Sequence, residues 1–78
     1  MYSVYLIQSK HNGSYYIGQT NNLIDRLKRH NGGHIKTTRS RKPWKLIKSE
    51  GFDKRRDAMW KEYLIKTRKK ERDKFIEK

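Results

Sequence analysis

The sequence predicts an α+β fold in which a small three-stranded antiparallel sheet is flanked by helices, and three observations support this prediction. Two segments rich in aromatic and β-branched residues lie close together, at residues 2–8 and 15–18. A third such segment follows at residues 44–50. Segments with the apolar spacing of helices lie between and after them. The predicted order is strand, strand, helix, strand, helix, with a further helix at the C-terminus, because helices packed on a sheet bury both sets of apolar residues.

The first two predicted strands form a hairpin. The residues between them, 11–14, read His-Asn-Gly-Ser, and Asn and Gly tolerate the positive φ that tight turns require. Alternate residues of a strand share a face, so the hairpin can bring the hydroxyls of Tyr5 and Tyr16 to one side of the sheet. Gly18 indicates a close approach of the backbone or a bend, which would leave room beside Tyr16 for a phosphate.

The first helix has Asn21 or Asn22 as its expected N-cap. Apolar residues at 23, 24 and 27, with His30 one turn further, share one helix face. Arg26 and Arg29 lie three residues apart on a neighbouring face. The run Asn-Gly-Gly at 31–33 ends the helix, because Gly readily takes the left-handed conformation of a C-cap.

The second half of the chain begins with a polar and basic loop, residues 34–43, which ends at Pro43. After the third strand, Asp53 is the expected cap of a helix that runs to Ile65. The tail, residues 68–78, is basic, and we expect a fraying helix held at one point by Phe75 and Ile76. Seventy-eight residues suffice for one small domain, so we expect a single domain over residues 1–78.

The charge of the chain points to a polyanionic partner. It has 21 Lys and Arg residues against 8 Asp and Glu, a formal net charge of +13. Nucleic acid is the default partner of so basic a domain. No window approaches 18 apolar residues and the N-terminus lacks the layout of a signal peptide, so we expect a cytoplasmic protein without membrane contact. The absence of cysteine excludes disulfides and thiolate metal sites.

Four residues of the first half are candidates for chemistry on a phosphodiester. A tyrosine such as Tyr5 or Tyr16 can donate or accept a hydrogen bond and can take a proton if its pKa is lowered. The guanidinium of Arg26 can bind two phosphate oxygens, and His30 can bond a tyrosine or hold the phosphate. Each also has a structural explanation: strand tyrosines pack, arginines cover surfaces, and histidines at helix ends stabilise structure.

Glu62 is the most informative residue of the second half. Its helical neighbours, among them Ala58 and Ile65, form a largely apolar face, and carboxylates rarely face inward unless they are paired or bind a metal. One carboxylate with phosphate oxygens and waters suits Mg²⁺. The alternative is an ion pair of Glu62 with Arg26, Lys61 or Lys66.

Together these residues resemble the GIY-YIG endonuclease family (the URI domain), in its small stand-alone bacterial form, over residues 2 to about 70. Ser3-Val4-Tyr5 stands at the first motif and Tyr16-Ile17-Gly18 at the second. Further similarity lies in the first helix with Arg26 and at residues 37–39, 43–46 and 58–62. Ser3 replaces the glycine of the first motif. Some members place a later asparagine in the site, and residues 63–78 contain no asparagine.

The resemblance implies a DNA endonuclease that hydrolyses phosphodiester bonds with one divalent ion, Mg²⁺ or Mn²⁺, in repair, recombination or processing. By this analogy Tyr5 is the general base, Tyr16 orients the phosphate, Arg26 stabilises developing charge, Glu62 holds the metal, and His30 supports a tyrosine or the phosphate. The basic residues expected to contact the DNA backbone are Lys28, Arg29, Lys36, Arg39, Arg41 and Lys42.

Two other functions remain open. The chain could be a non-catalytic nucleic-acid-binding module of the same fold, or a small basic protein that docks onto an acidic partner. For the nuclease we expect a monomer with little sequence preference, because no recognition helix or finger spacing is present. A protein partner would then supply targeting.

Overall fold

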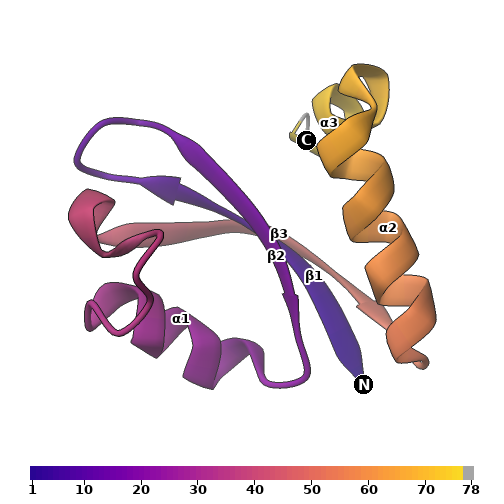
Figure 1. The fold of residues 1–78 in the computed structure, drawn as a ribbon, viewed down its shortest axis with the longest axis horizontal. Helices are drawn as coiled ribbons and strands as arrows, with labels where there is room; N and C mark the ends of the chain where they lie inside the picture. The colour runs from indigo at the N-terminus through magenta and orange to yellow at the C-terminus, as the bar shows by residue number, and fades with distance from the viewer. Residues whose placement is uncertain (77–78) are drawn as a thin grey trace.

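The computed structural model describes residues 1–76 and confirms the predicted fold class. Within these residues three strands form one sheet, and three α-helices and a 3₁₀ helix surround it (Figure 1). The elements are β1 (Tyr2–Ser9), β2 (Tyr15–Thr20), α1 (Leu23–Asn31), η1 (Arg39–Arg41), β3 (Trp44–Phe52), α2 (Arg55–Thr67) and α3 (Lys69–Ile76). The strands extend one to two residues beyond their predicted ends. Over the same residues, no helix is long and apolar enough to cross a membrane.

The sheet is antiparallel, with strand order β2-β1-β3, so that β1 is central. Both faces of β1 are therefore buried. Val4 and Leu6 pack on one face with residues of β2, α2 and α3, whereas Tyr5 and Ile7 pack on the other with Trp44. Figure 1 shows the same division, with α1 on one side of the sheet and α2 and α3 on the other. The face toward α1 carries both tyrosines of the candidate site.

The local signals for turns and caps act largely as predicted. Gly13 has a φ of 78° in the hairpin turn, and Gly33 has a φ of 79° after α1. Asn22 is the N-cap of α1, because its side chain accepts a hydrogen bond from the backbone N–H of Asp25 at 3.1 Å. The expected cap at Asp53 is wrong: Lys54 is the N-cap of α2, and no side chain caps this end.

The C-terminal part of the chain turns at Arg68 and continues as a separate helix, α3, that packs against α2. The predicted anchor at Phe75 is confirmed, since this ring is buried in the core with Ala58 and Ile65. The ammonium group of Lys48 lies 4.8 Å from the centre of the Phe75 ring. Residues 77 and 78 of the predicted tail lie outside the described residues.

Candidate active site

Tyr5 lies at the centre of the candidate site, on the face of β1 that is turned toward α1. Its hydroxyl is 2.9 Å from Nε2 of His30, and both side chains are buried. Burial and the neighbouring Tyr16 raise the pKa of Tyr5 above its usual range, and Glu62 adds to this effect. The nearby Arg26 acts in the opposite direction and lowers that pKa. The phenol is therefore neutral at pH 7 and is held in a hydrogen bond.

His30 connects Tyr5 to the loop that follows α1. Its Nδ1 atom lies 2.7 Å from the Oγ1 atom of Thr38, which is fully buried. Burial, together with the positive charge of Arg26, lowers the pKa of His30 to about 4. The imidazole is therefore neutral at pH 7, with one nitrogen donating and the other accepting. A neutral ring between two hydroxyls forms a chain of three groups along which a proton can move.

Trp44, the first residue of β3, holds this loop in place. Its indole N–H donates to the backbone carbonyl of Thr38 at 3.0 Å. The Trp44 ring also meets Tyr16 nearly edge-on, with the ring centres 6.3 Å apart. Neither Thr38 nor Trp44 was assigned a role from the sequence. Threonine beside a second threonine in a basic loop carries no local signal of burial.

Tyr16 and Gly18, on β2, complete the wall around Tyr5. The ring centres of Tyr16 and Tyr5 are 6.5 Å apart, and Tyr16 lies 5.3 Å from the ring of His30. The predicted close approach at Gly18 is confirmed, but the expected space for a phosphate there is wrong. A Cβ atom on Gly18 would lie 2.6 Å from the Tyr5 hydroxyl and 3.2 Å from the Tyr16 ring. The missing side chain makes room for the two tyrosines.

Arg26 on α1 and Glu62 on α2 bring opposite charges close enough to Tyr5 to shift its pKa. The Glu62 side chain is 21% exposed, and its carboxylate lies 2.6 Å from the ammonium group of Lys66. Of the three possible ion pairs predicted for Glu62, the structure contains the one with Lys66. The Glu62 carboxylate is thus partly exposed to water and paired with a neighbouring cation of the same helix.

A divalent ion can be accommodated at Glu62 on chemical grounds. Across residues 1–76 no three His, Asp or Glu side chains gather closely enough to hold a metal among themselves. Mg²⁺ does not require such a cage, because it keeps several waters and commonly binds through one or two carboxylates and the phosphates of its substrate. A partly exposed carboxylate fits this requirement, provided that Lys66 releases it.

The basic residues assigned to DNA contact differ in their surroundings. Lys28, Lys36, Arg39 and Lys42 are exposed on α1 and the loop after it. Arg29 is also exposed and pairs with Asp25 at 3.2 Å.

Arg41 is the exception among these residues, because it is half-buried and holds its own loop together. It donates to Ser14 and to the carbonyl of Thr37, and its guanidinium lies 5.1 Å from the centre of the Trp44 ring. The predicted contact of Arg41 with DNA stays a prediction. Replacing Arg41 would also disturb the structure of this loop.

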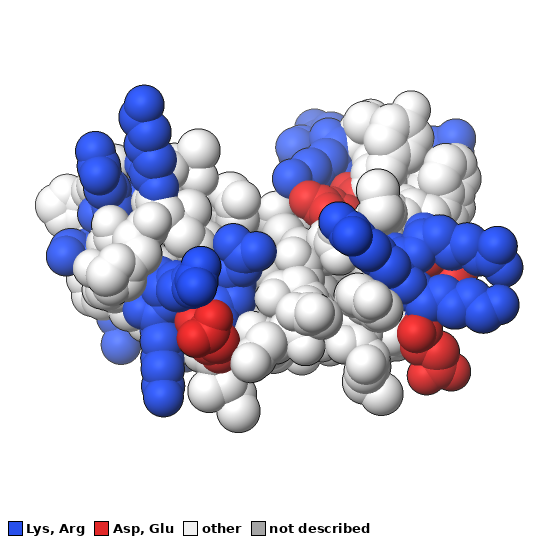
Figure 2. All heavy atoms as spheres, turned by 60° about the horizontal axis from the view of Figure 1, so that its bottom comes forward, with Lys and Arg blue, Asp and Glu red and all other residues white. Residues whose placement is uncertain are grey.

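The basic side chains on the surface form two groups, one on each side of the molecule. Figure 2 shows Lys and Arg side chains gathered over α1 and its loop on one side and over α2 and α3 on the other. A hollowed, mostly uncharged strip separates the two groups in this view. In Figure 1, β2 runs through the middle, between α1 and α2. A polyanion along this strip would therefore be flanked by positive charge on both sides.

The comparisons with known proteins agree with this arrangement. Residues 1–75 match the family model of the GIY-YIG catalytic domain. A UPF0213 protein of Bacillus licheniformis is 43% identical over 75 residues, covering 94% of this chain and 77% of the relative. The UPF0213 protein YazA of Bacillus subtilis is 46% identical over 69 residues, covering 85% of this chain and 69% of the relative.

A solved structure agrees as well. The solution NMR structure of the UPF0213 protein BH0048 from Bacillus halodurans has a TM-score of 0.55 and 35% sequence identity. The similarity covers 94% of this chain and 81% of that one. The fold and the match over residues 1–75 define a catalytic domain of a nuclease family. The chain belongs to the GIY-YIG family.

Proposed function

We propose that this protein is a metal-dependent endonuclease that hydrolyses phosphodiester bonds in DNA. One observation carries the proposal: the Tyr5–His30 hydrogen bond lies within electrostatic reach of both Arg26 and Glu62. A proton acceptor, a cation for the phosphate and a carboxylate for a metal ion are the parts that hydrolysis of a phosphodiester requires. The net charge of +13 supports a nucleic-acid substrate.

The proton chemistry follows from the pair of shifted groups. Tyr5 cannot act as a base by ionising first, because its pKa is raised. It can accept a proton from the attacking water while its own proton passes to Nε2 of His30, 2.9 Å away. Thr38 holds the far side of the imidazole and fixes its orientation.

Binding of the substrate would favour this transfer. Arg26 is one of the two causes that lower the pKa of His30. When a phosphate pairs with Arg26, the positive charge of the guanidinium is largely neutralised. The pKa of His30 then rises, and the imidazole becomes a better proton acceptor. His30 would thus accept the proton only when the substrate is present.

The remaining groups bind and orient the phosphate. The guanidinium of Arg26 can hold two of its oxygens and stabilise the charge that develops during the attack. The Tyr16 hydroxyl can donate to a further oxygen. A divalent ion, Mg²⁺ or Mn²⁺, held by Glu62 would supply further neutralisation of that charge. We propose roles in DNA repair, recombination or processing in the bacterial cytoplasm, since the relatives are bacterial.

One observation favours a second candidate, a nucleic-acid-binding module without catalysis. The carboxylate of Glu62 is paired with the ammonium group of Lys66 at 2.6 Å and therefore already has a cationic partner. A module that had lost its metal site would show the same pair. Metal-dependent cleavage separates the two functions.

The test is to incubate the protein with supercoiled plasmid and with branched DNA, in Mg²⁺, Mn²⁺ or EDTA. We expect nicking that requires metal and falls by a factor of about 10² to 10⁴ in Tyr5→Phe, a typical loss for a proton-transfer group. Arg26→Ala and Glu62→Gln should also lose cleavage. Tyr63→Phe, an exposed tyrosine on α2, is the matched control and should retain it. Salt-sensitive binding with no cleavage in any metal would favour the binding module.

A further inference from the structure

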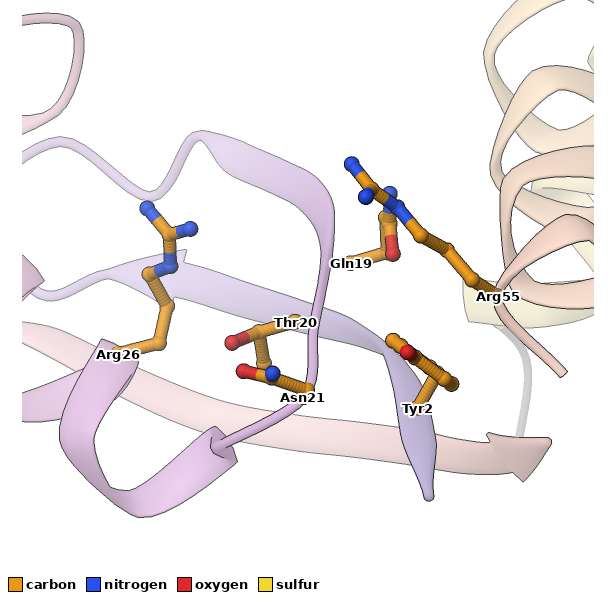
Figure 3. A pocket seen from close by; sticks show the side chains of 6 residues that line it. All are labelled: Tyr2, Gln19, Thr20, Asn21, Arg26 and Arg55. Carbon is orange, nitrogen blue, oxygen red and sulfur yellow. The ribbon is translucent and has the colours of Figure 1, made fainter. Parts of the chain in front are cut away.

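A cationic hollow lies at the end of β2, beside the candidate active site. It has a volume of about 270 Å³ and is lined by Tyr2, Gln19, Thr20, Asn21, Arg26 and Arg55. Figure 3 shows Arg26 extending from α1 on one side of β2 and Arg55 reaching from the start of α2 on the other. Gln19 lies beside Arg55 in this view. Two guanidinium groups from different elements therefore flank one polar space.

The lining carries two positive charges and no acid. Gln19 and Asn21 contribute amides, and the other two residues contribute hydroxyls. Neither Arg26 nor Arg55 forms an ion pair with any residue of the part of the chain that the structure describes. Two cations without a counter-charge add to the self-repulsion of a domain with a net charge of +13. An anionic ligand would relieve this repulsion.

A phosphate group matches the chemistry of this lining. The fork of a guanidinium pairs with two phosphate oxygens, and amide N–H groups can donate to the others. The volume of about 270 Å³ falls just below the range of about 300–1,000 Å³ that pockets for small organic ligands occupy. The hollow therefore suits a phosphate with part of its sugar better than a complete nucleotide.

Arg26 connects the hollow to the active site. Its side chain lines the hollow, and its charge acts on both Tyr5 and His30. Arg55 lies on the other side of β2 from Arg26, at the start of α2 (Figure 3). A phosphate in the hollow would thus lie next to the phosphate that Arg26 presents to Tyr5.

We propose that the hollow binds the phosphate adjacent to the scissile one on the cut DNA strand, with Arg55 as its main ligand. This inference rests on the proposed function and deepens it, because it fixes the path of the strand from the active site toward α2. Arg55 has no distinguishing signal in the sequence, since it is one of 21 basic residues. Only the fold brings it opposite Arg26.

The experiment measures binding without metal, so that it does not depend on cleavage. A fluorescent single-stranded oligonucleotide is titrated with wild type, Arg55→Gln and Arg56→Gln in EDTA, at several salt concentrations. Arg56 is the matched control, because it is the next residue of the same helix, is exposed and does not line the hollow. We expect Arg55→Gln to bind about 10-fold more weakly and its salt slope to fall by about one. Arg56→Gln should stay within about two-fold of wild type.

A second measurement locates the bound phosphate. In ¹⁵N-labelled protein, the backbone amide signals of residues 19–21 should shift on addition of the oligonucleotide in wild type and Arg56→Gln, but not in Arg55→Gln. Inorganic phosphate at the same phosphate concentration should cause smaller shifts. Equal losses in both variants, unshifted signals at residues 19–21, or a response to inorganic phosphate alone would each overturn the inference. A protein that does not cleave but shows the expected binding would refute the nuclease while leaving the phosphate site intact.

Discussion

Gly18 lies directly opposite Tyr5 in the pairing of β1 with β2, and a Cβ atom on Gly18 would stand 2.6 Å from the Tyr5 hydroxyl oxygen. Gly18 is not among the glycines with positive φ. The glycine is therefore required for the space that it leaves and not for its backbone conformation. Because Tyr5 is buried and bonded to His30, its ring cannot move aside without breaking that hydrogen bond.

Replacing Gly18 by alanine should therefore damage catalysis more than stability. We expect Gly18→Ala to displace the Tyr5 ring, to lower the free energy of unfolding by about 1–3 kcal/mol through overpacking, and to reduce cleavage by at least about 10-fold. Gly13→Ala is the control: its φ of 78° makes alanine cost about 1–2 kcal/mol, but nothing lies within 4 Å of a Cβ there. Thermal melting should show a similar loss of stability in both variants. Nicking rates should fall only in Gly18→Ala. Equal activity in both variants would contradict the idea.

Most of the fold could be predicted from the sequence because its signals are local. The pattern of β-branched and aromatic residues predicts β1, β2 and β3, and the Asn22 cap predicts the start of α1. The predicted N-cap at Asp53 is wrong. Acidic residues tend to occur near helix starts, but this tendency does not fix the exact position, and here Lys54 is the N-cap. The helix predicted at the C-terminus is confirmed as α3, which begins at Lys69, just after α2 ends at Thr67.

The candidate site could be predicted only in part. Tyr5, Tyr16, Arg26, His30 and Glu62 were identified through a family pattern that preserves their order in the chain. The residues that contact these side chains come from other segments of the chain. Thr38 is buried because Trp44 closes over its loop, and Arg55 meets Arg26 only because α2 begins beside the end of β2. Contacts between distant segments leave no local trace in the sequence.

The depressed pKa of His30 should make stability depend on pH. In the folded protein the pKa is about 4, against 6.5 for an ordinary histidine, so between these values the unfolded chain binds a proton that the folded protein does not. The contribution of His30 to the free energy of unfolding should therefore be fully present above pH 6.5. It should be lost as the pH decreases toward 4, by at most about 3 kcal/mol. Chemical denaturation of wild type and His30→Gln from pH 4 to 7 should show a flatter dependence in the variant. His34→Gln, at an exposed histidine, should follow wild type; a His30 variant with the wild-type slope would refute the assignment.

Thr38 should act as a positioning residue for His30. Thr38→Val preserves the shape but removes the hydroxyl that lies 2.7 Å from Nδ1, leaving a buried nitrogen without its partner. We expect a loss of about 1–3 kcal/mol in stability and a decrease of about 10- to 100-fold in kcat with little change in KM. Thr38→Ser should restore most of the activity, because it keeps the hydroxyl. Thr37→Val, at the exposed neighbour, should change neither; a purely structural Thr38 would lower stability without this rescue of kcat.

The ion pair between Lys66 and Glu62 should set the metal concentration that the nuclease requires. If the ammonium group of Lys66, 2.6 Å from the carboxylate, competes with the metal ion, its removal should strengthen metal binding. A partly exposed ion pair is worth about 0.2–1 kcal/mol, so Lys66→Ala should lower the Mg²⁺ concentration for half-maximal cleavage by up to about five-fold. Glu62→Gln should abolish the response to metal. Lys61→Ala is the control, because Lys61 pairs with Glu50 at 3.7 Å. A higher metal requirement in Lys66→Ala would mean that Lys66 assists the metal or the substrate and does not compete for Glu62.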